Sequence, residues 1–187
     1  MKLDLGCGHS PKAGHEGVDL FLPTADHRVN LYQFPWPWAD SSVDGLYSSH
    51  FLEHIPMAYI TPDGEINLTP HRPEDRDLLC RFMEEAHRIL VPGGEFHIVV
   101  PSGRSNRAFQ DPTHRRFFVA ESFQYFNKTW RKRVGIDHYL CSCDFDFKVW
   151  PTIPDALLNE EASEQRRILN AEWNATLDWN VVLTAKK

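Results

Sequence analysis

Strand-like and helix-like segments alternate along the chain, and this order restricts the fold more than any other feature. Seven segments have strand character: residues 2–6, 16–21, 26–32, 43–49, 95–101, 143–150 and 177–187. The helix pattern between the fourth and fifth strands implies parallel neighbours, and the last two strands read as an antiparallel finish. We therefore predict an α/β fold, a Rossmann-like three-layer sandwich with a mostly parallel seven-stranded sheet that ends in an antiparallel strand.

The length of 187 residues suits a single domain over residues 1–187. The clearest helix opens at Pro73, shows apolar residues on one face and stops at "PGG". A helix is also expected to begin at His50, and a short one to span 119–128. Two excursions from the sheet are expected, a hairpin-like one at about 56–72 and a helical one at about 154–173.

Composition narrows the class of protein. Hydrophobic residues make up 42% of the chain, but no window approaches the roughly 18 apolar residues of a membrane helix. Four scattered cysteines do not suggest a disulfide framework, so we expect a soluble, cytoplasmic protein without a membrane partner. The net charge of −6 argues against a generally basic nucleic-acid binder, although residues 104–133 carry a local positive excess that is either a solvated face or a dock for an anion.

The segment "LDLGCGHSPKAGHEGVDL" at 3–20 is the first candidate for a binding site. Gly6 and Gly8 follow the first strand, where they allow a sharp turn and close approach of a ligand. Asp19 ends the neighbouring strand, where a carboxylate can accept hydrogen bonds from the two hydroxyls of a ribose. Pro11 occupies the place of the third glycine of a dinucleotide fingerprint, which disfavours NAD and FAD.

Several motifs together resemble the class I S-adenosylmethionine-dependent methyltransferases, in particular their small type-11-like group. "LDLGCG" resembles the first motif of this family and "GVDL" its ribose-binding acid. "VNLYQFPWPWADSSVDGLYSSHFLEHI" resembles its adenine loop and fourth strand, and "EEAHRILVPGGEFHIVVP" its helix and fifth strand. The resemblance runs nearly end to end and implies that S-adenosyl-L-methionine is the cofactor and S-adenosyl-L-homocysteine the product.

The resemblance also implies cofactor contacts at particular positions. Asp4 and the backbone of Gly6 and Gly8 would hold the methionine part, and Asp19 the ribose. The adenine edge would meet Asn30, where the family often has an acid, and Leu31. The remaining expected cofactor residues are Cys7, Leu20, Ser48 and Ser49, the two serines at the end of the fourth strand.

Methyl transfer from a sulfonium needs alignment of the acceptor, exclusion of water and, for a hydroxyl, removal of a proton. His50 and His114 are the candidate bases, since they follow the fourth and fifth strands, and Asp111 could orient His114. Glu53 and His54 are weaker candidates, for which helix packing and capping are the default roles. No metal site is predicted, because Cys141-x-Cys143 lacks a matching second pair of ligands.

These observations predict an enzyme that methylates an oxygen or nitrogen of a small-molecule acceptor, for which the basic segment suggests an anionic one. Two alternatives stay open: an RNA or protein methyltransferase that docks through residues 104–133, and a non-catalytic module that binds S-adenosylmethionine. Nucleic acid is the less favoured partner, because the motifs of DNA amino- and cytosine methylases are not seen. The sequence leaves the oligomeric state open.

Overall fold

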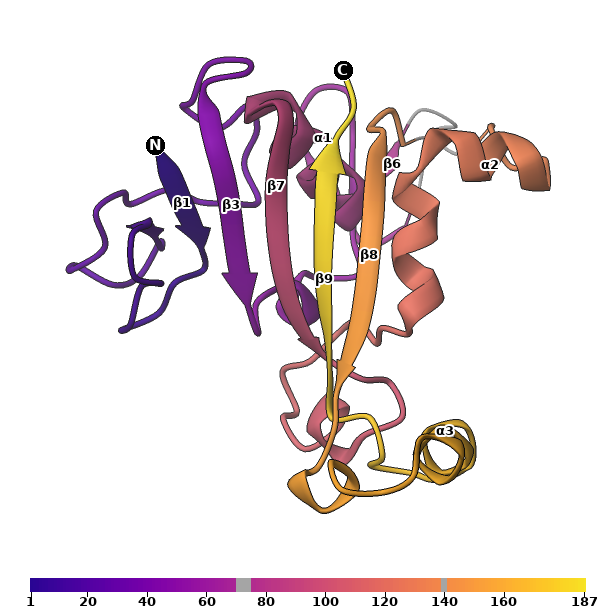
Figure 1. Cartoon of the computed structure of the whole chain (residues 1–187). Helices are drawn as coiled ribbons and strands as arrows, with labels where there is room; N and C mark the ends of the chain where they lie inside the picture. Colours follow the sequence, from indigo (N-terminus) through magenta and orange to yellow (C-terminus); the bar gives the residue numbers. More distant parts are fainter. Residues whose placement is uncertain (70–74, 139–140) are drawn as a thin grey trace.

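The computed structural model describes residues 1–69, 75–138 and 141–187, and a twisted six-stranded sheet forms its centre (Figure 1). The strand order is β2-β1-β3-β7-β9-β8. The strands are β1 (Lys2–Leu5), β2 (Glu16–Val18), β3 (Val43–Ser49), β7 (Leu90–Pro101), β8 (Phe145–Thr152) and β9 (Asp178–Ala185). The first four are parallel, and β9 runs antiparallel to both β7 and β8. The predicted Rossmann-like α/β class is confirmed, with six strands in this sheet instead of seven.

The strand expected at 26–32 accounts for the difference in strand number. The described chain makes only a single bridge there, between His27 and Val18. His27 donates to the carbonyl of Gly17 and accepts from the N–H of Asp19. The chain then turns at Asn30, whose side chain and carbonyl accept from Tyr32 and Gln33, and this turn ends the ladder after one bridge.

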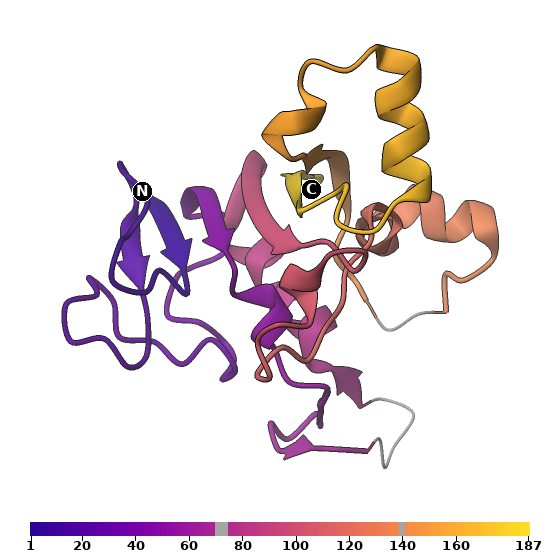
Figure 2. The same cartoon turned by 90° about the horizontal axis from the view of Figure 1, so that it is seen from below.

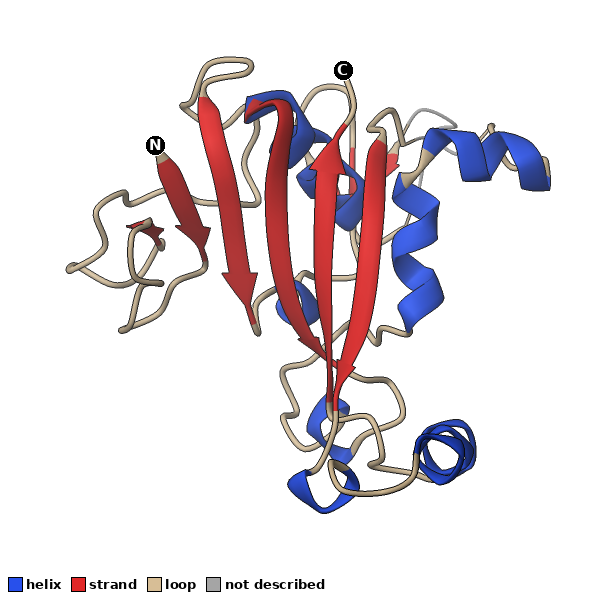
Figure 3. Cartoon of the chain, in the orientation of Figure 1, coloured by secondary structure: helices blue, strands red, loops and turns tan. Residues whose placement is uncertain are grey.

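Helix α1 (Leu78–Ile89) covers one face of the sheet (Figure 3). It begins five residues later than expected because Asp77 caps it, accepting from the N–H of Leu79 at 2.9 Å. The expected start at Pro73 lies outside the described residues. Phe82, Met83 and other apolar side chains of the helix are fully buried against the sheet, which forms the main core.

The opposite face of the sheet has no described helix over β3, β7 and β9 (Figures 1 and 2). Some side chains of this face are polar and open to solvent: Glu95 and His97 pair at 2.8 Å there, with about half of each side chain exposed. Within the described residues, the expected third layer of the sandwich is therefore not formed over these strands.

A second, three-stranded sheet consists of β4 (Tyr59–Ile60), β5 (Ile66–Asn67) and β6 (Arg76–Asp77), with β4 in the middle. β4 and β5 pair antiparallel inside the excursion predicted at 56–72, of which residues 70–72 lie outside the described part. The helix expected from His50 is reduced to the 3-10 turn η1 (Leu52–His54). Pro56 explains the early stop, because the residue before a proline, here Ile55 at ψ 121°, is driven to extended conformation.

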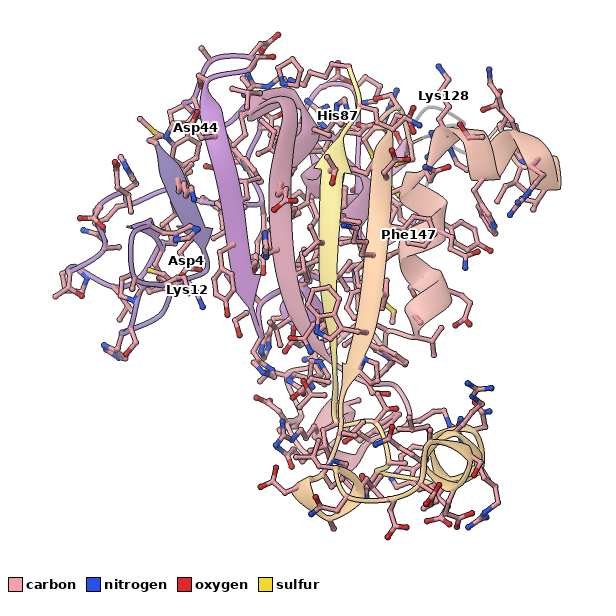
Figure 4. All side chains as sticks on the ribbon, viewed as in Figure 1. Asp4, Lys12, Asp44, His87, Lys128 and Phe147 are labelled. Carbon is pink, nitrogen blue, oxygen red and sulfur yellow. The ribbon has the colours of Figure 1, made fainter. Side chains whose placement is uncertain are left out.

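The remaining short helices lie at two different ends of the sheet (Figure 1). η2 (Asn106–Ala108), η4 (Asp155–Leu157) and α3 (Ala162–Ala171) lie beyond the ends of β7 and β8. η3 (Ala120–Phe126) packs beside β8, and α2 (Lys128–Val134) extends from the other end of the sheet, where Lys128 is labelled in Figure 4. The basic segment 104–133 is thus divided between both ends. None of the described helices has the length and apolar character needed to cross a membrane.

Candidate functional site

The glycine turn after β1 is held by the neighbouring strand. The N–H groups of Gly6 and Cys7 both donate to the carbonyl of Val18, at 2.9 and 3.2 Å. Gly6 and Gly8 have φ angles of +72° and +56°, which glycine adopts without a steric penalty. A Cβ on Gly6 would lie 2.3 Å from the ring of Phe51, whereas a Cβ on Gly8 would meet nothing within 4 Å. Gly6 is therefore needed for packing, and Gly8 borders open space.

The side chain of Asp4 also stabilises this turn. Its carboxylate is buried and accepts from the N–H of Lys12 at 2.8 Å, and the two residues lie together near the end of β1 (Figure 4). Burial raises the pKa of Asp4. This contact explains an acid at position 4 by local structure, and the contact with the methionine part of the cofactor stays a prediction.

The expected ribose and adenine residues lie on the loops after β2. Asp19 Oδ1 accepts from the N–H groups of Phe21 and Leu22, at 2.8 and 3.2 Å, and its Oδ2 has no hydrogen-bond partner among the described residues. Asn30 Oδ1 accepts from Tyr32, which leaves the amide nitrogen for a ligand. Leu31 has its side chain in the core, so only its backbone could face a ligand.

The other expected cofactor residues have local partners. The carbonyl of Leu20 accepts a long 3.4 Å bond from Arg28. Ser48 is fully buried and donates its hydroxyl to the carbonyl of Leu5 at 2.9 Å, so its side chain joins β3 to β1. Ser49, half-buried, is the last residue of β3. Burial and the neighbouring carboxylates, Asp4 first, raise the pKa of Cys7 to about 11.

A hollow of about 400 Å³ lies where β3 and β7 end, and it brings together residues from separate segments. Its lining consists of His50, Glu53, His54, Pro101, Arg107, Gln110, Asp111 and His114. The three residues predicted as catalytic, His50, His114 and Asp111, are all among them. Their roles in catalysis stay predictions, but the fold places them around one space.

His50 lines this hollow and has an unusual backbone conformation. It follows β3 directly and has a φ of +53°, a left-handed conformation that costs about 1–3 kcal/mol for a residue other than glycine. The turn brings its Nδ1 to 3.3 Å from Glu53 Oε1. Interaction with the Glu53 carboxylate raises the pKa of His50. The next residue, Phe51, packs on Gly6, so the hollow and the glycine turn are adjacent.

His114 and His54 are oriented by a hydrogen-bond network from the loop 108–114. His114 Nδ1 lies 2.9 Å from the carbonyl of Ala108 and donates to it, which leaves Nε2 as the lone-pair nitrogen. Nε2 lies 3.9 Å from Asp111 Oδ2 and 4.0 Å from Glu53 Oε1. The hydroxyl of Thr113 donates to Asp111 at 2.7 Å and therefore accepts from His54 Nδ1, at 3.0 Å.

Glu53, His54 and Arg107 also line the hollow, although they are not among the residues predicted as catalytic. Glu53 is buried, and Arg107 reaches the hollow while forming an ion pair with Asp178. The signal for Glu53 was its spacing of three residues from His50 in a turn that follows a strand end. The sulfur atoms of Cys141 and Cys143 lie 3.3 Å apart, and all four cysteines of the chain are free thiols.

Neither a protein-family model nor a curated protein matches the sequence, whereas solved structures of similar fold do. The chain is similar to an S-adenosylmethionine-dependent methyltransferase from Archaeoglobus fulgidus, with 16% identity, 98% of this chain and 85% of that chain covered, and a TM-score of 0.57.

Two further similar structures contain ligands. One is phosphoethanolamine N-methyltransferase 2 of Haemonchus contortus, in complex with phosphomonomethylethanolamine and S-adenosylhomocysteine (18% identity, 99% and 48% covered, TM-score 0.52). The other is 1,6-didemethyltoxoflavin-N1-methyltransferase of Burkholderia thailandensis, with bound 1,6-didemethyltoxoflavin and S-adenosylhomocysteine (13% identity, 100% and 71% covered, TM-score 0.51). At these identities the similarity establishes the fold: this chain has the class I methyltransferase fold.

Proposed function

We propose that the protein is an S-adenosylmethionine-dependent methyltransferase that acts on an oxygen or nitrogen of a small, anionic acceptor. One observation carries the proposal. On a class I methyltransferase fold, His50, Glu53 and His114 line a hollow directly next to the glycine turn, through the contact of Phe51 with Gly6. This is the edge of the sheet where ligands bind in open α/β folds.

The residues of the turn fit the cofactor. The open space at Gly8 allows close approach of the methionine part to the backbone, and the unpartnered Oδ2 of Asp19 can accept from a ribose hydroxyl. The amide of Asn30 can bond the adenine edge. When bound, the cofactor supplies a methyl group that its sulfonium already activates, so the protein needs no nucleophile of its own.

The chain's own residues then align the acceptor and remove its proton. His50 and His114 flank Glu53 and can each take a proton from a hydroxyl or ammonium group in the hollow. The Glu53 carboxylate stabilises the imidazolium that forms, as the raised pKa of His50 indicates. General-base catalysis of this kind contributes about 10²- to 10⁴-fold to the rate.

Arg107 is the residue of the hollow that supports an anionic small molecule, although the carboxylates of Glu53 and Asp111 line the same space. Arg107 lines the hollow, and its guanidinium forms an ion pair with Asp178. Other arginines of the basic segment are used inside the protein: Arg116 bonds the carbonyls of Ile55 and Pro56, and Arg131 is buried. Fewer arginines of the basic segment are therefore available to bind RNA or protein.

The test is a screen of anionic metabolites with S-adenosylmethionine labelled in the methyl group. We expect labelled product from at least one acceptor, and a fall of about 10²- to 10⁴-fold in turnover for His50→Ala, with cofactor affinity retained. His97→Ala, on the open face of the sheet, is the control and should leave turnover unchanged. Cofactor binding without product in the whole screen would instead identify a non-catalytic binding module.

A further inference from the structure

Glu53 is a buried carboxylate whose Oε1 lies 3.3 Å from Nδ1 of His50, in a contact that is not aligned as a hydrogen bond. Its side chain is 1% exposed, and neither oxygen receives a well-aligned hydrogen bond from the described residues. The residue is held firmly, since its carbonyl accepts from the N–H groups of Arg115 and Arg116 at 2.7 and 3.0 Å. Burying an ionised carboxylate costs several kcal/mol unless a cation or hydrogen bonds compensate it. The position therefore calls for a positive charge in the hollow.

Two imidazoles lie beside this carboxylate. One nitrogen each of His54 and His114 and one oxygen of Glu53 all lie within 4.8 Å of one another. The two rings meet edge to face, with centroids 4.7 Å apart. In a tetrahedral zinc site with bonds of 2.0–2.1 Å, ligand atoms are about 3.3 Å apart, so small side-chain rotations would close the set around an ion.

The surrounding hydrogen bonds prepare both histidines as ligands. His114 donates Nδ1–H to the carbonyl of Ala108, and His54 donates Nδ1–H to Thr113, whose hydroxyl is anchored on Asp111. Each ring is thereby fixed as the tautomer with a free Nε2 lone pair. Such second contacts are the usual companions of histidines that bind metals, and they raise the affinity of the site.

We propose that Glu53, His54 and His114 bind a divalent transition-metal ion. Two imidazoles and one carboxylate suit the ions from Mn²⁺ to Zn²⁺ better than Mg²⁺ or Ca²⁺, which prefer oxygen ligands throughout. Three protein ligands leave a coordination position open toward the hollow.

The metal site also indicates which acceptor atom the enzyme would methylate. This consequence rests on the proposed function. An acceptor hydroxyl bound at the open position would lose its proton more readily, which favours an oxygen nucleophile. His114 would then serve as a ligand, and His50, outside the ligand set, would be the remaining proton acceptor. Binding of the metal does not depend on this consequence and can be measured by itself.

The experiment is a titration of untagged, chelator-treated and dialysed protein with Co²⁺, followed by calorimetry and by visible d–d absorption. We expect one Co²⁺ per chain, displaced by Zn²⁺, and loss of the site in Glu53→Gln and His114→Ala. Thr113→Val changes no ligand and should lower the affinity about 10- to 100-fold. The surface pair offers the matched control: Glu95→Gln with His97→Gln should bind Co²⁺ as the wild type does.

Two results would overturn the proposal. One is the absence of Co²⁺ binding to folded wild-type protein. The other is binding that survives Glu53→Gln and shows the near-ultraviolet charge transfer of a thiolate, which would place the ion at Cys141 and Cys143. If Glu53→Gln does not fold, the affinity of Thr113→Val for Co²⁺ is the deciding measurement, because Thr113 is exposed. Wild-type affinity in that variant would overturn the proposal. Failure of the proposed function appears separately, as Co²⁺ binding without affinity for S-adenosylhomocysteine.

Discussion

Alanine at Gly6 and at Gly8 should have different effects, although both glycines belong to one turn and both have positive φ. At Gly6 the new Cβ would lie 2.3 Å from Cδ2 and 2.5 Å from Cγ of Phe51. Phe51 cannot retreat freely, because its ring packs between Tyr32 and Phe82, with centroids 6.1 and 5.9 Å away. The left-handed conformation costs about 1–2 kcal/mol and the overpacking about 1–3 kcal/mol. Gly6→Ala should thus lower the free energy of unfolding by about 2–5 kcal/mol.

Gly8→Ala should cost only the backbone term, about 1–2 kcal/mol, since its Cβ would meet nothing within 4 Å. The same open space is where we place the methionine part of the cofactor. Gly8→Ala should therefore fold and still lose affinity for S-adenosylhomocysteine. The glycine pair thus separates packing at position 6 from ligand contact at position 8.

Urea unfolding and calorimetry measure the two effects. A double-mutant cycle with Phe51→Ala isolates the clash: the cost of Gly6→Ala should fall by about 1–3 kcal/mol in that background. Equal losses of stability for Gly6→Ala and Gly8→Ala would refute the packing argument. Wild-type affinity for S-adenosylhomocysteine in Gly8→Ala would refute the placement of the cofactor.

Three further predictions concern other residues. Asp19→Ala should weaken binding of S-adenosylhomocysteine by about 1–3 kcal/mol through lost bonds to the ribose, measured by calorimetry, while Asp44→Asn at the other end of the sheet should not. Because burial and nearby acids raise the pKa of Cys7 to about 11, its thiol should be alkylated far more slowly at pH 8 in folded than in urea-unfolded protein and regain reactivity as pH approaches 11; equal rates, followed by mass spectrometry, would contradict the raised pKa. Asp77→Ala removes the N-cap of α1 and the 3.0 Å ion pair with Arg116, so the free energy of unfolding should fall by about 1–2 kcal/mol in urea titrations; no change would show that the cap contributes nothing.

The positions of the parallel strands along the chain could be predicted because turn residues lie next to their apolar segments. The glycines after β1 and the "PGG" before the apolar part of β7 are examples. The predicted strand positions also place His50 and His114 after neighbouring strands, and strands that are parallel neighbours end at one edge of the sheet. The gathering of the candidate bases could thus be anticipated, although their roles stay predictions.

The rest depends on long-range packing, which local patterns do not contain. The segment 26–32 has strand composition, but the turn at Asn30 removes it from the ladder. The burial of Glu53 follows from the N–H groups of Arg115 and Arg116, more than 60 residues away, which bring the loop 108–116 onto η1. The sequence pattern predicts an ordinary helix acid at Glu53, and Pro56 was the local sign, given too little weight, that the helix would end after one turn.

The central claim is that the glycine turn and Asp19 form a site for S-adenosylmethionine on this fold. The most direct measurement is calorimetric titration of the purified protein with S-adenosylmethionine and S-adenosylhomocysteine, with NAD as the control. We predict micromolar binding of both sulfur compounds, one per chain, and no heat from NAD. Binding of NAD, or no binding of either sulfur compound to folded protein, would contradict the account.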